Sequence, residues 1–473
     1  MKAKQLAWVV FIVMSIVFFA LEAAHFRHSV SDENTYFYMA KAVSEGQVPY
    51  RDFFLAHPPV HILFLAVFYK LFGFSLFVLK ATAPLSIILA AVFMFRIVEE
   101  KIGVKEAVVS AALFYFSYDL LRFSTFAAWI VLAVPLMVIS SYFMLNKRYV
   151  VSAVFMAAAC LTGLFSLVGA AASIAYLIIA DRKGVMKFAL TFFGLFLAAN
   201  LLLVLVFGSS YMESVYYYHL AKPAEASDKI ALFWQFARLN PVLVGAAFAS
   251  FAFFLAGRGL KRVFVLSAAV SAAFLLALLF INKLFVYYFL PVIPYLAILG
   301  SSGITAVADW VGDMRRKQAV WFLAAIIVVS SAAGSYYYLQ NTFQDFEDAG
   351  RIASYVRDNS QNGDAIFGDD SITPLIAILA DRKLAFNFID GNSLRWRSGL
   401  LDINDTMRRI KAENVRFVIE RRLNDGRGSF NYGVAYIDIF RDFLKKDCRA
   451  EQSFKTAWQK YYKEYYVYDC REK

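Results

Sequence analysis

Long apolar stretches recur along the first 340 residues and are separated by short polar turns. Runs of about 17–25 apolar residues are long enough to cross roughly 30 Å of hydrocarbon as helices. This pattern predicts a polytopic α-helical membrane domain over residues 1–340. We expect about eleven transmembrane helices, near residues 5–24, 76–98, 104–122, 125–145, 149–165, 166–181, 185–207, 241–257, 261–281, 284–301 and 318–339.

The apolar segment 57–72 is ambiguous, because it is short and begins with His57-Pro58-Pro59. Short cytoplasmic loops of membrane proteins are rich in Lys and Arg. If segment 57–72 does not cross the membrane, all the basic clusters of the membrane domain lie on one side of the membrane. We therefore predict that it lies along the outer surface or is partly inserted, in a plasma-membrane protein with a cytoplasmic N-terminus. The clusters are Lys2/Lys4, Arg96/Lys101/Lys105, Lys147/Arg148, Arg182/Lys183/Lys187, Arg258/Lys261/Arg262 and Arg315/Arg316/Lys317.

After residue 340 short apolar strings alternate with amphipathic helical patterns. Such alternation predicts a soluble α/β domain over residues 341–473, which the topology places outside the cytoplasm. Cys448 and Cys470 lie in this domain, and there they either form a disulfide or remain two free thiols. We expect strands at 364–369, 384–388 and 415–420, and helices at 345–358, 372–380 and 401–413.

Composition agrees with a membrane protein, since 60% of the residues are hydrophobic and only 18% are charged. The formal net charge is +12. Acidic and basic residues nearly balance after residue 340, so the basic excess belongs to the membrane domain. There the basic residues set the orientation of the helices and attract lipid headgroups, and we expect no nucleic-acid partner. The first apolar run leads into more membrane, which favours an uncleaved span over a removed signal peptide.

Asp32 and Glu33 are an acidic pair in the first outer loop, residues 25–75, just after the first span. In one interpretation Ser31 and Asp32 cap a short surface helix, with the acids near its positive end. In the other, a partly buried carboxylate removes a proton from an acceptor hydroxyl. The two interpretations are compatible.

Asp119 lies near the outer end of the predicted span 104–122. An ionisable residue at that depth is costly and points to function. The alternative is an ion pair with Arg122, one turn along the helix. The predicted topology places Asp119 on the same membrane face as Asp32.

Several groups on that face could hold an anion such as a phosphate. Lys, Arg and His are the usual charged partners of phosphate oxygens. The alternatives are an interfacial aromatic belt for the tyrosines and an ordinary loop lysine. The candidates are His57, His219, Lys222, Lys283, Tyr287 and Tyr288.

The acidic pair, followed by Gly46-x-x-Pro49-Tyr50-x-Asp52 and His57-Pro58-Pro59, resembles the first outer loop of GT-C fold glycosyltransferases. The resemblance is to the protein O-mannosyltransferase and aminoarabinose lipid A transferase branch. Asp119 with Arg122 resembles the second outer acidic position of that branch. Its late phosphate-side segment is similar to the string from Lys283 through Tyr287-Tyr288 to Leu290-Pro291 and Pro294.

The resemblance implies a sugar transfer outside the cytoplasm, with inversion, from a dolichyl- or undecaprenyl-phosphate donor. The acceptor would be a protein, a glycan or a lipid, and the sugar a hexose or a pentose. Asp32 would be the general base, and Glu33 and Asp119 would position the acceptor or the donor sugar. We predict no cofactor, and the need for a divalent metal is left open. The departing phosphate would be steadied by His57, Arg122, Lys283 and Tyr288, although many relatives carry Lys where this chain has His57.

Three other functions fit a polytopic protein. A secondary transporter would carry intramembrane charges, but its broken helices often repeat in two halves. A metal-dependent membrane hydrolase could use His25, His28, His57 and His61 with Asp32, although the spacings are loose. A non-catalytic scaffold would bind partners through the C-terminal domain. In a transferase, the same domain would instead select the acceptor.

Overall fold

The computed structural model describes residues 2–222, 228–255, 261–311, 345–424, 429–431, 438–458 and 461–471, with residues 318, 325, 329, 330, 332–334, 336 and 337. The chain forms two compact units. The first unit comprises Met1–Phe26, Lys80–Leu202 and Glu225–Asn341. The second comprises Arg27–Leu79, Leu203–Ala224 and Thr342–Lys473.

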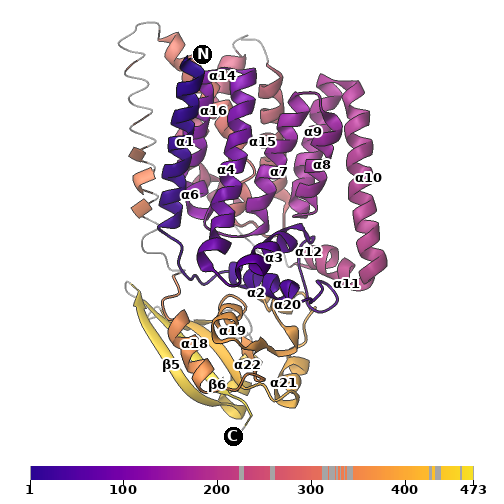
Figure 1. Ribbon diagram of the computed structural model, residues 1–473, viewed down its shortest axis with the longest axis vertical. Helices are drawn as coiled ribbons and strands as arrows, with labels where there is room; N and C mark the ends of the chain where they lie inside the picture. The colour runs from indigo at the N-terminus through magenta and orange to yellow at the C-terminus, as the bar shows by residue number, and fades with distance from the viewer. Residues whose placement is uncertain are drawn as a thin grey trace. The chain divides into compact units, whose positions relative to one another are not determined.

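The first unit is helical throughout its described residues, as Figure 1 shows. Apolar runs of the sequence form the helices of this unit, and polar turns end them, as the sequence pattern predicts. The helices are α1 (Lys2–Ala23), α4 (Leu76–Lys101), α5 (Val104–Tyr115), α6 (Tyr118–Phe123), α7 (Trp129–Leu145), α8 (Tyr149–Cys160), η1 (Leu164–Ser166), α9 (Leu167–Ala180), α10 (Arg182–Phe207), α13 (Lys229–Leu239), α14 (Pro241–Leu255), α15 (Arg262–Phe280), η3 (Val286–Phe289) and α16 (Ile293–Trp310).

Four of the described helices, α1, α4, α10 and α15, are long and apolar enough to cross a membrane. Helices α13 and α14 form a fifth candidate that bends by 93°. The predicted span 104–122 is instead two helices, because the chain breaks at Phe116 and Ser117 before α6 begins. Most of the predicted span 318–339 lies outside the described residues. The total of eleven spans therefore stays a prediction.

Small residues let the helices of the first unit approach closely. Helix α14 packs on α16, α16 on α5, and α5 on α1. A Cβ added at Gly303 of α16 would lie only 2.1 Å from the carbonyl oxygen of Ala246 in α14. Glycine is therefore required at this crossing, as at many membrane helix interfaces.

In the second unit, the loop between α1 and α4 folds into two helices. Helix α2 packs against α3 and also against α19 of the C-terminal part. Because α3 has 13 residues, it is only about 20 Å long, shorter than the hydrocarbon core. The helical elements that this unit takes from the loops are α2 (Glu33–Ser44), α3 (Val60–Phe72), α11 (Ser209–Met212), η2 (Glu213–Tyr217) and α12 (Tyr218–Ala221).

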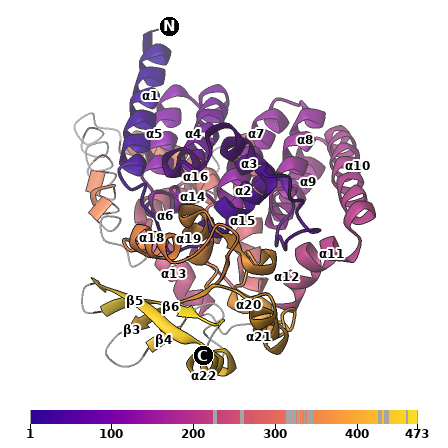
Figure 2. The ribbon, with the colours of Figure 1, turned by 60° about the horizontal axis from the view of Figure 1, so that its bottom comes forward.

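The C-terminal part of the second unit contains a six-stranded sheet of order β2-β1-β3-β6-β5, with β4 also paired to β3. Strand β1 is parallel to β2 and β3, and β6 is antiparallel to β3 and β5. The long β5–β6 hairpin, whose sequence mixes aromatic and charged residues, is missing from the sequence prediction; Figure 2 shows it beside β3. The strands are β1 (Ala365–Gly368), β2 (Lys383–Leu384), β3 (Phe417–Asn424), β4 (Ser429–Asn431), β5 (Arg449–Trp458) and β6 (Tyr461–Asp469).

One expected strand is wrong. Of residues 384–388, only Leu384 lies in a strand, and Ala385–Asn387 form the 3₁₀ turn η4. Phe386 and Asn387 have φ angles of 42° and 53°, which turn the chain out of the extended conformation. The helices around the sheet are α18 (Ala349–Asp358), α19 (Thr373–Ala380), α20 (Ser393–Arg397), α21 (Ile403–Ala412) and α22 (Asp438–Asp447).

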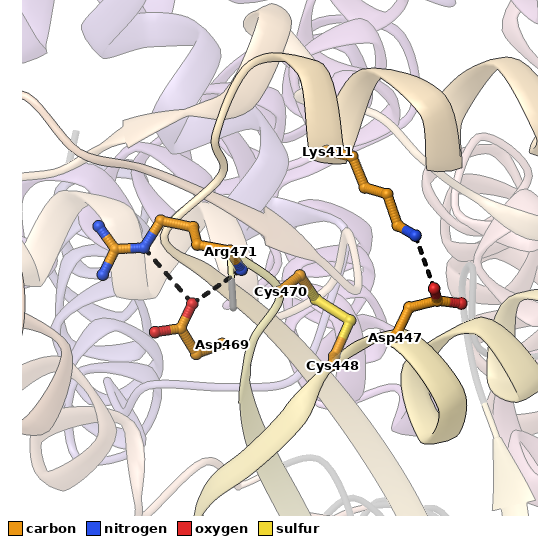
Figure 3. Close-up of a disulfide and its surroundings, with 6 residues drawn as sticks. All are labelled: Lys411, Asp447, Cys448, Asp469, Cys470 and Arg471. Carbon is orange, nitrogen blue, oxygen red and sulfur yellow. Dashed lines mark hydrogen bonds and ion pairs between the residues drawn. A yellow bond between two sulfur atoms is a disulfide. The ribbon is translucent and has the colours of Figure 1, made fainter. Parts of the chain in front are cut away.

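A disulfide joins Cys448 and Cys470, with an S–S distance of 2.11 Å (Figure 3). Cys448 directly precedes β5 and Cys470 directly follows β6, so the bond ties the two open ends of the hairpin. Both sulfur-bearing side chains belong to the buried core formed with Phe440, Leu444 and Val418. Of the two alternatives that the sequence left open, the structure has the disulfide.

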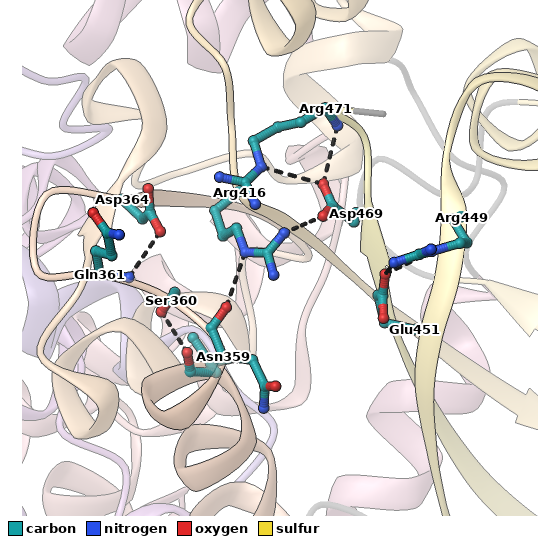
Figure 4. Close-up of polar contacts among 10 residues, drawn as sticks. Asn359, Ser360, Gln361, Asp364, Arg416, Arg449, Glu451, Asp469 and Arg471 are labelled. Carbon is teal, nitrogen blue, oxygen red and sulfur yellow. Dashed lines mark hydrogen bonds and ion pairs between the residues drawn. The ribbon is translucent and has the colours of Figure 1, made fainter. Parts of the chain in front are cut away.

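Polar contacts of Arg416 link three parts of this domain (Figure 4). Its guanidinium donates to the carbonyl oxygen of Asn359, 2.9 Å away at the end of α18, and pairs with Asp469 of β6. At the start of β1, Asp364 accepts a hydrogen bond of 2.8 Å from the backbone of Gln361. These contacts fix the amino end of β1, the end opposite Asp369 and Asp370.

Candidate active site

Asp32 occupies the N-cap position of α2, but its side chain makes no capping hydrogen bond. The capping interpretation therefore does not account for this carboxylate. Asp32 is exposed to solvent, whereas Glu33, Asn34 and Thr35 behind it are buried. Glu33 accepts a hydrogen bond from the Ser29 hydroxyl. Of the two acids, Asp32 is thus the one open to a substrate.

The start of α2 is held against the turn between β1 and α19. The Thr35 hydroxyl donates to the carbonyl oxygen of Asp370 at 2.8 Å. The Asn34 amide donates to the carbonyl oxygens of Ser371 and Ser29, each at 2.6 Å. These bonds place Asp32 beside the carboxyl end of β1.

The turn after β1 carries two adjacent acids, Asp369 and Asp370. Gly368 has φ 153°, and a Cβ there would lie 2.0 Å from the carbonyl oxygen of Ile419. Only glycine lets β1 approach β3 this closely before the turn. Asp369 pairs with Arg421 at 3.3 Å and accepts a hydrogen bond from the backbone of Ser371.

A third segment, at residues 390–395, completes this acidic region. Asp390 accepts a hydrogen bond of 2.7 Å from the Asn392 amide, and its carbonyl oxygen accepts one from Arg395. The Arg395 guanidinium lies 3.8 Å from the centre of the Phe54 ring. The Tyr218 hydroxyl donates to Asn392 at 3.2 Å, which brings α12 to the same place.

This environment raises the pKa of Asp32 from its ordinary 3.8 to about 6. Although part of the Asp32 side chain stays exposed, the protein packed around the carboxyl displaces much of its water, and this is the main cause. Repulsion from Asp390 and, to a smaller degree, from Asp369 raises the pKa further. Lys222 and Arg421 act in the opposite direction. A carboxylate with a pKa near 6 is still ionised at neutral pH and is more basic than an ordinary aspartate, which suits a general base.

His57, His219 and Lys222 form a neighbouring group. The two imidazole rings lie 5.4 Å apart. His219 Nε2 is 2.7 Å from the carbonyl oxygen of Ala56, so this nitrogen carries the proton. Its Nδ1 is left to accept from Lys222 Nζ at 3.1 Å.

Burial is the main cause that lowers the pKa of both histidines, to about 4 for His219 and well below 6.5 for His57. Repulsion from His219 and Lys222 lowers the pKa of His57 further. Both rings are therefore neutral at pH 7. In this group the positive charge is on Lys222, and His57 offers hydrogen bonds rather than charge.

Asp119 lies in the first unit, at the start of α6. The Asn240 amide donates to Asp119 Oδ2 at 2.7 Å, and Asn240 Oδ1 accepts from the Asp119 backbone at 3.4 Å. Asp119 Oδ1 is buried and has no hydrogen-bond partner among the described residues. Ser117 and Asn240 line a small cavity in the same region.

The late aromatic segment lies beside α6 in the first unit. The Tyr287 ring is 6.0 Å from Phe123 and 4.9 Å from Tyr288, and the Lys283 ammonium is 5.1 Å from the Phe285 ring. Arg122 lies over the ring of Phe123 at 4.9 Å. Residues far apart in sequence thus lie close together in this part of the first unit.

The candidate residues therefore fall into two groups, one in each unit. Sequence reasoning missed the acids and the arginine that surround Asp32, namely Asp369, Asp370, Asp390 and Arg395. One signal could have found the first pair, because two acids follow a short buried strand, and ligand sites gather at the carboxyl ends of parallel strands. Within the described part of the chain, no group of three or more His, Cys, Asp or Glu side chains is arranged to hold a metal ion, as the hydrolase alternative would require.

No protein-family profile matches this chain, and no curated protein matches it. Solved structures do resemble it. ArnT from Cupriavidus metallidurans bound to undecaprenyl phosphate has a TM-score of 0.65 at 13% identity, over 97% of this chain and 98% of that one. The oligosaccharyltransferase AglB from Archaeoglobus fulgidus, in complex with an inhibitory peptide and a dolichol-phosphate, has a TM-score of 0.57 at 12% identity, over 91% of this chain and 74% of that one. The arabinofuranosyltransferase AftD from Mycobacteria has a TM-score of 0.55 at 13% identity, over 98% of this chain and 40% of that one. These likenesses show that the chain has the GT-C glycosyltransferase fold.

Proposed function

We propose that this protein is an integral-membrane glycosyltransferase that uses a polyprenyl-phosphate sugar as donor. The observation that carries the proposal is the fold, which extends over nearly the whole of ArnT, a protein solved with undecaprenyl phosphate. AglB, which has the same fold, is solved with a dolichol-phosphate. The apolar helices α1, α4, α10 and α15 supply the membrane setting that such a lipid donor needs.

In the proposed reaction, Asp32 removes the proton from an acceptor hydroxyl. The acceptor oxygen then attacks the anomeric carbon from the face opposite the phosphate, and the bond between that carbon and the phosphate oxygen breaks. The electron pair leaves with the phosphate, and the configuration is inverted. The exposed, ionised carboxylate of Asp32, which makes no capping bond, supports this role.

Negative charge on the leaving phosphate requires cations, since preorganised donors stabilise charge that develops in a transition state. In the second unit we assign this role to Lys222, which lies near Asp32. Arg122 and Lys283 of the first unit are candidates for it from the sequence resemblance alone. His57, Tyr287 and Tyr288 add neutral hydrogen-bond donors. His219, whose one N–H is bonded to the carbonyl oxygen of Ala56, instead accepts from Lys222 and orients it. Asp119, fixed by Asn240, and the buried Glu33 are positioning residues in this proposal.

The proposal also includes eleven spans, a cytoplasmic N-terminus, a boundary near residue 340 and a C-terminal domain outside the cytoplasm. The short helix α3 supports an outer-surface position for residues 57–72, because it is too short to cross a membrane unaided. The disulfide Cys448–Cys470 supports an oxidising compartment for the C-terminal domain. The acceptor is then a hydroxyl on a protein, a glycan or a lipid on that side.

The direct experiment is incubation of the purified protein with a panel of radiolabelled polyprenyl-phosphate sugars and a membrane extract. We expect label to move from one of these donors to an acceptor in the extract. A protein that is folded, inserted and inactive with every hexosyl and pentosyl donor would contradict the proposal. Transfer with soluble nucleotide sugars in place of the lipid donors would also contradict it.

A further inference from the structure

Asp370 stands out in the acidic region beside Asp32. It is 8% exposed, and its side chain makes no hydrogen bond or ion pair with any described residue. A buried polar group without a partner is costly, so native structures satisfy such groups with protein, water or a ligand. The Asp370 carboxyl is therefore left to bond with water or with a ligand that arrives from the solvent.

The neighbours of Asp370 are already engaged. Asp369 is paired with Arg421, and Asp390 accepts from Asn392. Both of these acids, and Asp32, repel the carboxylate form of Asp370, and burial disfavours it even more. The pKa of Asp370 is therefore raised well above its ordinary value of 3.8, and a carboxyl that gains a proton both donates and accepts a hydrogen bond.

Arg395 supplies a second unsatisfied group at this place. It is 8% exposed, and its Nε is buried without a hydrogen-bond partner among the described residues. The rings of Phe54 and Phe388 lie 3.8 Å and 5.8 Å from its guanidinium, and its Nη1 is bonded to the carbonyl oxygen of Asp390. The side chain is thus fixed, and its electrostatic partners include Asp390 and Asp370.

We propose that Asp370, with Asp390 and Arg395, forms a subsite that binds hydroxyl groups of a sugar ring next to Asp32. A hydroxyl fits these groups because it donates to a carboxylate, accepts from the Arg395 guanidinium and makes bonds of both kinds with a carboxyl that has gained a proton. The subsite gives the C-terminal part a direct role in substrate binding, and it deepens the proposed transferase function, on which it rests.

The sugar comes either from the donor or from a glycan acceptor, and the two sources share this chemistry. In the transfer assay, replacing Asp370 raises KM for whichever substrate carries the bound ring. We expect an increase of about tenfold or more for Asp370→Ala, because a ligand hydroxyl loses its partner. Asp370→Asn, which keeps one donor and one acceptor, retains more of the affinity.

A binding measurement tests the subsite without the transfer reaction. Saturation-transfer NMR of the full-length protein in detergent, with free D-mannose and D-arabinose as probes, reports contact with the sugar ring. We expect signal for at least one probe with the wild type, loss of that signal in Asp370→Ala, and no loss in the control Asp364→Asn. Asp364 is the matched control because it lies at the other end of β1 and accepts its hydrogen bond from the backbone of Gln361.

Thermal unfolding separates binding from a structural role. Removal of an unpartnered buried acid should leave Tm unchanged or raise it, while the sugar signal is lost. If Asp370→Ala fails to fold, Arg395→Lys, which removes the buried Nε, serves as the second variant and should also lose the signal.

Equal sugar signals in the wild type and Asp370→Ala, or no signal with either probe, would overturn the subsite. A drop in Tm with an unchanged signal would assign Asp370 a structural role and would overturn it as well. If the wild type transfers no sugar but binds one through Asp370, the subsite stands and the transferase proposal fails. The two proposals are therefore tested separately.

Discussion

At the residue scale, the central feature is one exposed aspartate surrounded by other acids. The sequence identifies Asp32 as a candidate because it follows an apolar span and lies in a polar loop. Both features can be read from the residues next to it in the chain. Asp370 and Asp390 were not identified in this way, because more than three hundred residues of chain separate them from Asp32 and only folding brings them together. The charge state of His57 was equally hidden, since it depends on burial and on His219 and Lys222.

The pKa of Asp32 predicts a pH dependence of transfer. A general base is active when deprotonated, and the pKa of this carboxyl is raised to about 6. We expect kcat/KM to be constant above pH 7 and to fall about tenfold per pH unit below about pH 6. Asp390 and Asp369 raise the pKa of Asp32 and so move this fall in rate to higher pH, whereas Lys222 and Arg421 move it to lower pH.

The control for this profile is far-UV circular dichroism at each pH, which shows whether the protein stays folded. A rate that remains constant down to pH 4.5 in the folded protein would contradict the assignment of Asp32 as the base.

At the element scale, apolar runs predicted helices well and irregular segments poorly. The runs that became α4, α7 and α10 are continuous, so length and hydropathy identify them. The break between α5 and α6 and the 3₁₀ turn η4 depend on tertiary contacts and on positive φ angles, which hydropathy does not report. The β5–β6 hairpin was missed because its aromatic and charged residues do not form a continuous apolar string.

The crossing of α14 and α16 gives a prediction about stability. Gly303→Val would place a Cβ 2.1 Å from the carbonyl oxygen of Ala246, so the helices must separate. We expect a loss of about 1–3 kcal/mol in the free energy of unfolding, measured as a lower Tm in detergent. Gly245→Val is the matched control, because a Cβ at Gly245 of α14 meets no atom within 4 Å. Equal Tm values for the two variants would contradict this packing.

The disulfide gives a second element-scale prediction. Cys448 and Cys470 are 22 residues apart, and closing a loop of that size stabilises the folded domain by about 3 kcal/mol. We expect the double variant Cys448→Ser/Cys470→Ser to be cleaved faster by protease in the C-terminal domain. Reductant should speed cleavage of the wild type and leave the variant unchanged. An equal effect of reductant on both proteins would show that another bond is responsible.

At the scale of the whole molecule, the sequence alone led to the GT-C resemblance, and the comparison with solved structures confirms that fold. The sequence did not predict which segments make up each of the two units. The loop between α1 and α4 belongs with the C-terminal part, because α2 packs against α19. Hydropathy describes each segment separately and contains no information on such contacts between distant segments. The same packing carries Asp32 to the end of β1.

The topology is a prediction for the intact protein in its membrane. A reporter enzyme that is active only outside the cytoplasm, fused after Lys473, should be active, because eleven spans from a cytoplasmic N-terminus end outside. A second fusion after Lys147 serves as the cytoplasmic control and should be inactive. Activity of the Lys147 fusion and inactivity of the Lys473 fusion would reverse the proposed orientation.

The central claim is that Asp32 is the base of a sugar transfer from a polyprenyl-phosphate donor. The most direct measurement compares the initial rate of transfer by Asp32→Asn with that of the wild type and of Glu45→Gln, a control in an exposed ion pair at the other end of α2. We predict that Asp32→Asn is folded and binds the donor but transfers sugar about 10²–10⁴-fold more slowly, while Glu45→Gln is unchanged. Transfer by Asp32→Asn at the wild-type rate would contradict the account.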